Sequence, residues 1–286
     1  MNTVCMPILL KRVTPFLSLI FLSSCAGKMK QESDFNAYLP PSSSIFEDSS
    51  PLPAEVNPTT TPSFWDLSDV DISYVQTDRK LLAFTFDDGP SKTMENILAV
   101  FADFNERNPD CMATATFFMN GMHLTEESLP LLHTAHILGC ELGNHAYRHL
   151  DLTTLSKTEL DAEITSTDKL LSKVDGKTLH LFRPPFGHIN GEIKAQLQTP
   201  IINWTIDTLD WTGESEEDIY NCVFNARFSG GIVLMHDGYH ATVNALKRLL
   251  PALKADGYQV VSVSALAKAH GCTLYNGKEY IRARKQ

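Results

Sequence analysis

The sequence of 286 residues lacks the signatures of several common protein classes. No GxGxxG or GxxxxGK motif follows its first strand-like run, so nothing supports a nucleotide cofactor. No two cysteines have the CxxC spacing, which argues against a zinc site built from cysteines. Basic residues are outnumbered by acidic ones, and the formal net charge is −10. Because an acidic protein repels the phosphates of nucleic acids, we expect no nucleic-acid partner.

Long hydrophobic runs are also missing. The run VTPFLSLIFL (13–22) follows two basic residues, is too short to span a bilayer as a helix, and has the character of a signal-peptide core. It ends in LSSC (22–25), which resembles the bacterial lipoprotein signal, in which cleavage precedes a lipid-modified Cys. The resemblance implies a signal peptide at 1–24 and an exported protein anchored through Cys25 to a bacterial membrane, facing the cell wall or periplasm. An ordinary secretory signal cleaved near Ala26, or a retained anchor, is the alternative.

The next segment, residues 25–78, is rich in Ser, Pro and Thr and has little apolar periodicity. Such a composition buries little surface, so we expect a mostly disordered tether. Within it, FWDLSDV (64–70) is expected either to dock on the domain or to act as a short linear motif. Residues 79–286 are long enough for one domain with a sizeable core. A protein shortened to begin near Asp78 is therefore expected to keep full activity.

Four cysteines lie beyond the predicted anchor, at Cys111, Cys140, Cys222 and Cys272. In an exported protein they can form disulfides in any of three pairings, between which the sequence does not choose. Each can equally be a small buried apolar residue.

Past residue 80, strand-like and helix-like stretches alternate. The strand-like runs are LLAFTF (81–86), ATATFFM (113–119), CELGN (140–144), HLFRP (180–184), IINWTI (201–206), GIVLMH (231–236) and YQVVSV (258–263). Helical signals mark residues 94–107, 156–176 and 241–257, the second beginning with a capping box of Ser156 and Glu159. Seven strands alternating with helices predict an α/β fold with parallel strands, arranged either as an open doubly wound sheet or as a barrel.

Polar residues stand where these predicted strands end. They are Asp87 and Asp88 after the first strand, His145 and His149 after the third, Arg183 after the fourth, Asp210 and Trp211 after the fifth, and His236 at the end of the sixth. Because the C-terminal ends of parallel strands open on one face, we expect these side chains to converge there. Singly, each has an ordinary structural explanation, such as a capped turn or a core histidine. Their recurrence at successive strand ends favours an active site.

The spacing of two histidines points to a metal. His145 and His149 are four residues apart, which places both on one side of a helical turn. Ala146 stands where a zincin has Glu, so that class is excluded. Two histidines and a distant carboxylate would make a three-ligand site with open positions, as in catalytic metal centres. Asp88 can be that carboxylate while Asp87 remains free as a base, and the cation reduces the repulsion between the two.

Five segments carry a family resemblance. They are TFDDG (85–89), HAYRH (145–149), RPPFG (183–187), DTLDW (207–211) and LMH (234–236). With these segments in order, the chain from about residue 80 to 270 resembles the polysaccharide deacetylase family, also called the NodB-homology domain or carbohydrate esterase family four. The resemblance implies a distorted (β/α) barrel of about seven parallel strands at residues 79–286, and a hydrolase that releases acetate.

The same resemblance implies a role for each matched residue. Asp88, His145 and His149 would bind one divalent metal ion, with zinc expected and cobalt or another divalent ion as alternatives. Asp87 would be the general base, and Arg183 would pair with it and set its ionisation.

The other implied roles concern proton donation and the substrate. Asp210 would support His236, the general acid, and Trp211 would line the cleft. The backbone N–H of Phe186 would help to hold an oxyanion, although the family usually has Tyr there. The family also usually has Ser or Thr where this chain has Ala146, which predicts the loss of a hydrogen bond that braces the loop.

The implied reaction is the attack of metal-activated water on an acetyl carbonyl, with Asp87 accepting a proton and His236 protonating the leaving amine. An exported lipoprotein meets the cell wall first, so N-acetylglucosamine of peptidoglycan is the leading substrate. O-acetyl esters of xylan or another acetylated glycan are the alternative. A glycan-binding lipoprotein without catalysis is an alternative of another class, and the intact acid–base pair argues against it.

Overall fold

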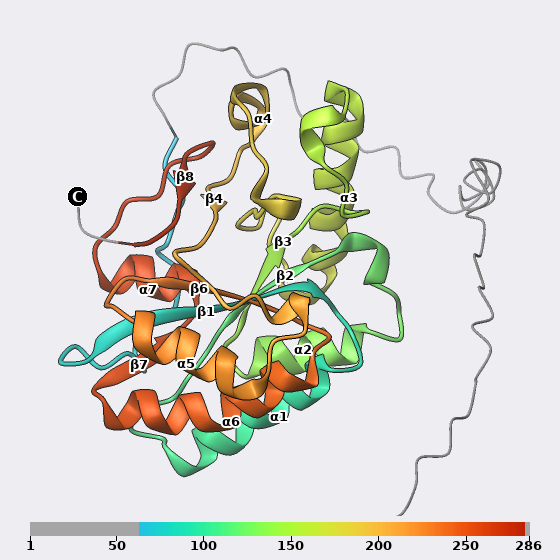
Figure 1. The fold of residues 1–286 in the computed structure, drawn as a ribbon. Helices are drawn as coiled ribbons and strands as arrows, with labels where there is room; N and C mark the ends of the chain where they lie inside the picture. The colour runs from blue at the N-terminus through green and yellow to red at the C-terminus, as the bar shows by residue number, and fades with distance from the viewer. Residues whose placement is uncertain (1–62, 284–286) are drawn as a thin grey trace, which may run out of the picture. The chain divides into compact units, whose positions relative to one another are not determined.

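The structure is a computed structural model that describes residues 63–283 (Figure 1). The predicted signal peptide, the lipid site at Cys25 and the tether up to residue 62 lie outside the described residues. Between residues 63 and 283, no helix combines the length and the apolar character that crossing a bilayer requires.

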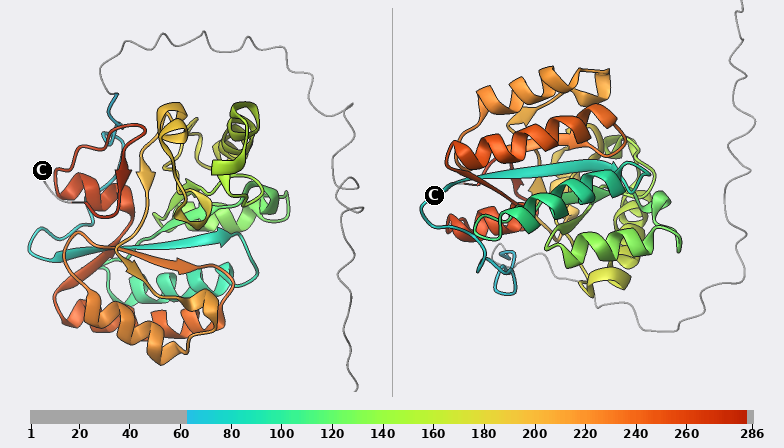
Figure 2. Two further views of the ribbon diagram at one scale, coloured as in Figure 1. Left: turned by 45° about the horizontal axis from the view of Figure 1, so that its top comes forward. Right: turned by 90° about the horizontal axis from the view of Figure 1, so that it is seen from below.

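A parallel sheet forms the centre of the domain, with its strands in the order β3, β2, β1, β6, β5. Their bounds are β1 Lys80–Gly89, β2 Thr116–Met119, β3 Glu141–Asn144, β5 Ile206–Asp207 and β6 Ile232–His236, and β7 Tyr258–Val261 also pairs with β1. Strand β6 runs beside β1 in the same direction (Figure 2). The other edge of β1 is shared, because β7 pairs with its first half and β2 with its second half. The C-terminal ends of β1 and β6 therefore meet on one face.

Short pairings extend this sheet into a distorted barrel. Phe182 forms parallel bridges with Asn144 of β3 on one side and with Ile201 on the other. Ile201 belongs to β4 (Ile201–Ile202), which pairs in parallel with β8 (Glu279–Tyr280). The predicted α/β fold with parallel strands in a distorted barrel is confirmed.

Two of the predicted strands differ in detail from the structure, and one observed strand was not predicted. The run HLFRP contributes only the bridges of Phe182, because the prolines that follow at 184 and 185 have no N–H to donate to a ladder. The run IINWTI is divided between β4 and β5. Strand β8 was not predicted, since two residues carry no readable period.

Seven helices occur among the described residues. They are α1 Met94–Arg107, α2 Leu129–Ile137, α3 Lys157–Asp175, α4 Gly191–Gln196, α5 Glu216–Ala226, α6 His240–Ala255 and α7 Val263–Ala269. Helix α1 has the predicted bounds. Helix α3 begins with the predicted capping box of Ser156 and Glu159 and ends at Gly176, whose φ of 75° lies in the left-handed region that glycine favours.

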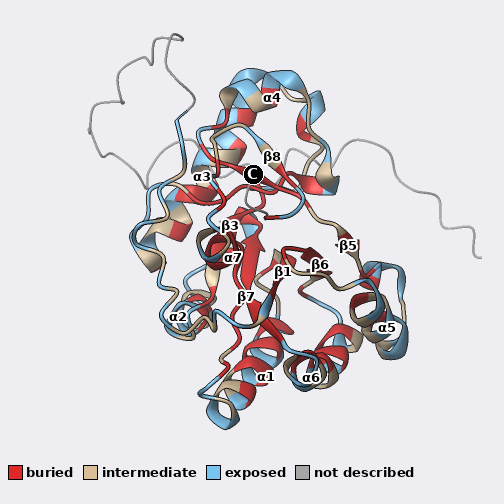
Figure 3. Ribbon diagram, turned by 90° about the vertical axis from the view of Figure 1, so that its left-hand side faces the viewer, coloured by how far each residue is buried: buried red, intermediate tan, exposed pale blue. Residues whose placement is uncertain are grey.

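Side chains that alternate along β1 face two separate parts of the core, and one of the two series leads into the site. Leu82, Phe84 and Phe86 face the large core under α1, α2, α5 and α6. Leu81 and Ala83 face the smaller core beneath α7. Figure 3 shows the buried strands between helices whose outer faces are exposed. Because side chains alternate along a strand, Thr85 and Asp87 continue the second series and point into the barrel.

The stretch 63–78, which the sequence analysis assigned to the tether, packs against the domain. The Trp65 N–H donates to the Leu274 carbonyl at 2.7 Å, and the Tyr74 hydroxyl hydrogen-bonds to Thr114 Oγ1 at 2.7 Å. Further apolar side chains join the core beneath α7, namely Leu67, Val70, Ile72 and Val75. The predicted boundary at residue 78 is therefore corrected: the packed domain includes residues from 63 onward. The sequence did not reveal this packing, because the apolar residues of 63–78 are scattered among polar residues without a regular period.

Buried thiols account for two of the cysteines. Cys111 and Cys140 are buried and form no disulfide, which agrees with the second of the two predicted alternatives. Burial raises the pKa of the Cys140 thiol to about 12, so it stays protonated.

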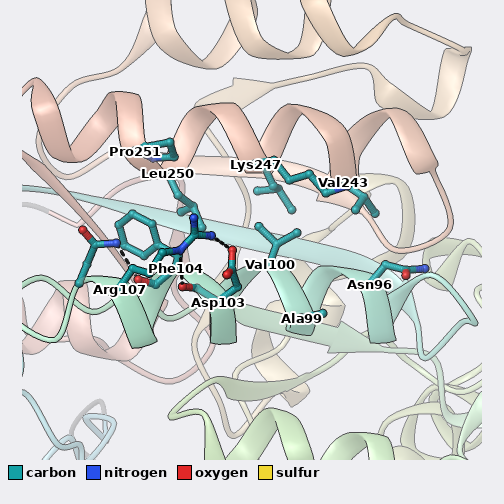
Figure 4. Close-up of a pocket in the computed structure, with 12 residues that line it drawn as sticks. Asn96, Ala99, Val100, Asp103, Phe104, Arg107, Val243, Lys247, Leu250 and Pro251 are labelled. Carbon is teal, nitrogen blue, oxygen red and sulfur yellow. Dashed lines mark hydrogen bonds and ion pairs between the residues drawn. The ribbon is translucent and has the colours of Figure 1, made fainter.

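A groove of about 710 Å³ lies between α1 and α6 (Figure 4). Its floor includes Val100, Leu246 and Leu250, and at its rim Arg107 pairs with Asp103 one helical turn away. None of the residues that line it belongs to the five motif segments. The groove is therefore separate from the predicted active site.

Candidate active site

The two neighbouring aspartates occupy a β-bulge at the end of β1. Between Phe86 and Gly89, β1 has one residue more than β2, and Asp88 has a φ of 71°. In a regular strand, adjacent side chains point to opposite faces. Here both carboxylates approach one imidazole: Asp87 Oδ2 lies 3.7 Å and Asp88 Oδ1 3.5 Å from His145 Nε2. The bulge thus brings both charges to the same site.

Asp88, His145 and His149 form a cluster whose donor atoms all lie within 4.8 Å of one another. His149 Nε2 is 3.3 Å from Asp88 Oδ1. His145 Nδ1 donates to the Arg183 carbonyl at 2.7 Å, which leaves the Nε2 lone pair facing the cluster. Burial lowers the pKa of His145 against the opposing charges of Asp87 and Asp88, which favours the neutral, ligating form. Two imidazoles and one carboxylate in this arrangement fit a divalent metal ion.

Arg183 and Asp87 form a buried ion pair. The Arg183 side chain is 0% exposed, and its Nη1 donates to Asp87 Oδ1 and to Thr85 Oγ1, each at 2.7 Å. Its Nε donates to the Ile202 carbonyl at 2.9 Å. Burial lowers the pKa of Arg183, and the charge of Asp87 opposes that shift. Because Arg183 occupies Oδ1, the other oxygen of Asp87 remains on the side of His145.

His236 and Asp210 form a second acid–base pair. Asp210 is 1% exposed and accepts from His236 Nδ1 at 2.7 Å, from the His236 N–H at 2.8 Å and from Thr242 Oγ1 at 2.6 Å. Burial lowers the pKa of His236, but the hydrogen bond to Asp210 and the charges of Asp87 and Asp210 outweigh it, so the pKa is raised overall. His236 is also the register partner of Asp87 on the neighbouring parallel strand.

Backbone strain is concentrated in the motif segments. The non-glycine residues with positive φ among residues 63–283 are Asp88, Ala146, His149, Phe186 and Leu209. All of them lie in four of the five segments that carry the family resemblance. Left-handed conformations cost energy in such residues and cluster at functional sites, where the surrounding structure holds them.

Exposed apolar side chains surround these groups. Phe186 is 56% and Trp211 54% exposed, so both side chains are accessible from solvent. The Phe186 ring meets the His149 ring edge-on, with centroids 4.6 Å apart, so its contact with the metal-site loop does not require a phenol. Tyr239, which the sequence analysis did not consider, is 37% exposed, with its ring centroid 6.3 Å from that of His236.

Two further residues hold the site: Asn120, which the strand-end pattern did not include, and Asp237, which directly follows the sixth predicted strand but was given no role. Asn120 Nδ2 donates to Asp88 Oδ1 at 3.2 Å, and the strand-end rule would have found it, because it directly follows β2. Asp237 accepts from the Ser91 N–H at 2.7 Å and from Ser91 Oγ at 2.8 Å, which fixes the turn after the bulge. Burial raises the pKa of Asp237, and these hydrogen bonds oppose the shift.

Comparison with known proteins identifies the family. A family model described as polysaccharide deacetylase matches residues 74–200. The peptidoglycan-N-acetylglucosamine deacetylase of Bacillus cereus is 36% identical over 203 residues, which cover 68% of this chain and 91% of that protein. This chain belongs to the polysaccharide deacetylase family. The predicted family and its enzyme class, a deacetylase hydrolase, are thereby confirmed.

Other relatives are longer than this chain. It is 31% identical to the bifunctional xylanase/deacetylase of Pseudobutyrivibrio xylanivorans, covering 68% of this chain and 31% of that protein. It is 33% identical to the peptidoglycan-N-acetylmuramic acid deacetylase PdaC of Bacillus subtilis, covering 67% of this chain and 40% of that protein. The chain thus spans less than half the length of these two relatives.

Solved structures share the fold. That of PdaC has a TM-score of 0.63 at 32% identity and covers 68% of this chain and 93% of that chain. A family 4 acetyl xylan esterase from Clostridium thermocellum, solved with a cobalt ion, has a TM-score of 0.65 at 25% identity and covers 71% and 98%.

Proposed function

We propose that this chain is a metal-dependent deacetylase of N-acetylated sugars in a polysaccharide, with N-acetylglucosamine of peptidoglycan as its leading substrate. One observation carries the proposal. Asp87 and His236, the proposed base and acid, are register partners on adjacent strands, and the Asp88–His145–His149 cluster lies beside Asp87. An acid and a base beside a metal site are what metal-assisted amide hydrolysis requires.

Asp88, His145 and His149 would hold one divalent ion. Two imidazoles and a carboxylate suit zinc, and cobalt or another divalent ion is the alternative. When bound, such an ion acts as a Lewis acid and increases the acidity of water at neutral pH. The side chains of Asp88 and His149 are 37% and 29% exposed, so a substrate can reach the cluster.

Asp87 would accept the proton of the attacking water. Arg183 holds Asp87 Oδ1, which keeps the carboxylate oriented and compensates its buried charge. Oδ2, on the side of His145, is then the oxygen that receives the proton. A positioned general base typically contributes about 10²–10⁴-fold to the rate.

His236 would donate the proton that the leaving amine needs. Because Nδ1 is bonded to Asp210, Nε2 is the nitrogen that faces the substrate. The raised pKa of His236 increases the protonated fraction near neutral pH, which suits an acid. The backbone N–H of Phe186 would stabilise the oxyanion, and Trp211 would line the cleft.

The names of the relatives support two different substrates, peptidoglycan and acetylated xylan. The Bacillus relatives are named peptidoglycan deacetylases, which favours the cell wall, and a lipid anchor at Cys25 would hold the enzyme close to it. A second candidate is the removal of O-acetyl groups from xylan. It is favoured by the xylanase/deacetylase relative and by the acetyl xylan esterase structure.

Acetate release from peptidoglycan, chitin oligomers and acetylxylan, with and without a chelator, tests the proposal. We expect the highest turnover on peptidoglycan, loss of turnover with chelator and recovery on addition of Zn²⁺. Highest turnover on acetylxylan would favour the second candidate. A protein that binds these glycans but releases no acetate from any of them would be a non-catalytic glycan-binding protein.

A further inference from the structure

A buried carboxylate from α3 holds the loop that carries both histidines. Glu163 is 2% exposed, and its Oε2 accepts from the N–H groups of Tyr147 at 2.9 Å and Arg148 at 2.7 Å. Its Oε1 accepts from Arg148 Nε at 2.6 Å. The carboxylate therefore touches the two residues midway between His145 and His149, and Arg148 balances its charge.

The conformation of this loop explains why an anion is needed. Ala146 and His149 have φ values of 63° and 57°, so a left-handed residue stands on each side of the Tyr147–Arg148 pair. The successive N–H groups of that pair converge on one point, as in the backbone nests that bind anions. Glu163 supplies the anion from within the chain.

The other backbone hydrogen bonds of residues 146–148 in the structure are made with uncharged groups. The Ala146 N–H donates to Asn144 Oδ1 at 2.8 Å. The carbonyls of Ala146 and Tyr147 accept from the N–H groups of Gly121 and Met122 at 3.0 and 2.9 Å. The bracing that was expected to be lost with Ala146 is thus supplied from elsewhere.

We infer that Glu163 is a positioning residue that holds His145 and His149 in the geometry a metal ion requires; this inference rests on the proposed function. The hydrogen bonds of the Glu163 carboxylate are with Tyr147 and Arg148, not with either histidine side chain, so Glu163 acts through the backbone between the histidines. When the carboxylate is replaced, the two N–H groups compete for a weaker acceptor. The left-handed turns then relax, and the imidazoles lose their shared orientation.

The Zn²⁺ affinity of the full chain, measured by competition with a chromophoric chelator, tests the inference. In Glu163→Gln the amide has about the same size, but its NH₂ group faces the Arg148 Nε donor. We expect Zn²⁺ to bind about 10–100-fold more weakly, the usual effect of removing a partner that orients a ligand. Acetate release should recover at saturating Zn²⁺, because no reacting group has changed.

Asp168→Asn is the matched control. Asp168 is another buried carboxylate of α3, 4% exposed, and it accepts from His180 Nδ1 at 2.8 Å, away from the histidine loop. This control should lower stability and leave Zn²⁺ affinity unchanged. Should Glu163→Gln fail to fold, Glu163→Asp keeps the charge, shortens the reach and is expected to show the same weakening.

Wild-type affinity in Glu163→Gln, or equal weakening in Glu163→Gln and the control Asp168→Asn, would overturn the inference. A wild-type protein that binds no Zn²⁺ would instead contradict the proposed metal site, and the inference would fall with it.

Discussion

Four carboxylates lie around the C-terminal ends of β1 and β6, where like charges repel and burial makes ionisation costly. The structure gives each its own donors. Asp87 has Arg183, Asp88 has Asn120 and the histidine cluster, Asp210 has His236 and Thr242, and Asp237 has Ser91. Separate partners allow chemically identical side chains to perform different tasks within one site.

The pair of Asp210 and His236 leads to a pH prediction. Asp210 is a main cause that raises the pKa of His236 against the effect of burial, and a general acid works only while protonated. Asp210→Asn should therefore lower that pKa and move the alkaline limb of the rate profile to lower pH. At neutral pH we expect a loss of about 10²-fold or more.

Acetate release measured over a pH series, as kcat/KM, checks this. An alkaline limb that stays in place in Asp210→Asn would show that His236 is not the acid that sets it.

At the scale of elements, local signals made part of the fold predictable. Helix α1 has a full apolar face, and α3 has a capping box and a terminal glycine, so their bounds follow from nearby residues alone. The site residues were predictable for a related reason. The end of a strand is a local feature, and parallel pairing places all such ends on one face.

Features that depend on pairing between distant segments were not predictable. The bulge at Asp88 exists only relative to the register of β2, and no local pattern announces it. Phe182 replaces a predicted strand because it lies between β3 and β4. Glu163 appeared as an ordinary polar residue of a helix, and only the packing of α3 against the histidine loop shows its role.

The contacts of helix α3 with His180 also lead to a prediction of how the stability of the protein depends on pH. His180 is buried between Asp168 and Asp175, with Nδ1 at 2.8 Å and Nε2 at 3.2 Å from the carboxylates, and both nitrogens donate only when the ring is protonated. Burial lowers the pKa of His180, but both hydrogen bonds and both charges outweigh it and raise the pKa above 6.5. The stabilisation is therefore complete below about pH 6.5 and is lost as the pH rises through the higher folded-state pKa.

Urea unfolding of the wild type and of His180→Gln at a series of pH values measures this contribution. The difference in unfolding free energy should be largest below about pH 6.5 and should shrink above it. A difference that does not change with pH would mean that folding leaves the pKa of His180 unchanged.

At the scale of the whole molecule, the N-terminal stretch 63–78 contributes to the stability of the domain. A protein that begins at Arg79 loses the packing of Trp65 and its apolar neighbours beneath α7. Fully buried apolar side chains contribute about 1.5–3 kcal/mol each, and these are partly buried, so we expect a loss of roughly 3 kcal/mol or more. Denaturant unfolding checks this, with a protein that begins at Ser63 as the control. Equal stability of the two would restore the boundary predicted from the sequence.

Attachment to a membrane is a separate prediction, because Cys25 lies outside the described residues. If the LSSC segment is a lipoprotein signal, Cys25→Ser removes the only atom that carries the lipid. The variant should appear in the soluble fraction, whereas the wild type should stay with the membranes. Fractionation of cells expressing each protein decides between them, and a variant that remains with the membranes would exclude this anchor.

The proposed mechanism gives different roles to Asp87 and Asp88, the two neighbours in the bulge. Asp88→Asn removes the only anionic ligand of the proposed metal cluster and leaves a weaker amide donor, so the metal should be lost. Asp87→Asn should keep the metal and lose about 10²–10⁴-fold in turnover, because it removes the base alone.

Metal content by mass spectrometry, with acetate release measured on the same purified variants, is the most direct test. We expect Asp88→Asn to be free of metal, and Asp87→Asn to be loaded with metal but nearly inactive. Loss of metal from Asp87→Asn together with its retention in Asp88→Asn would reverse the two roles. Retention of metal and activity in both variants would place the active site elsewhere.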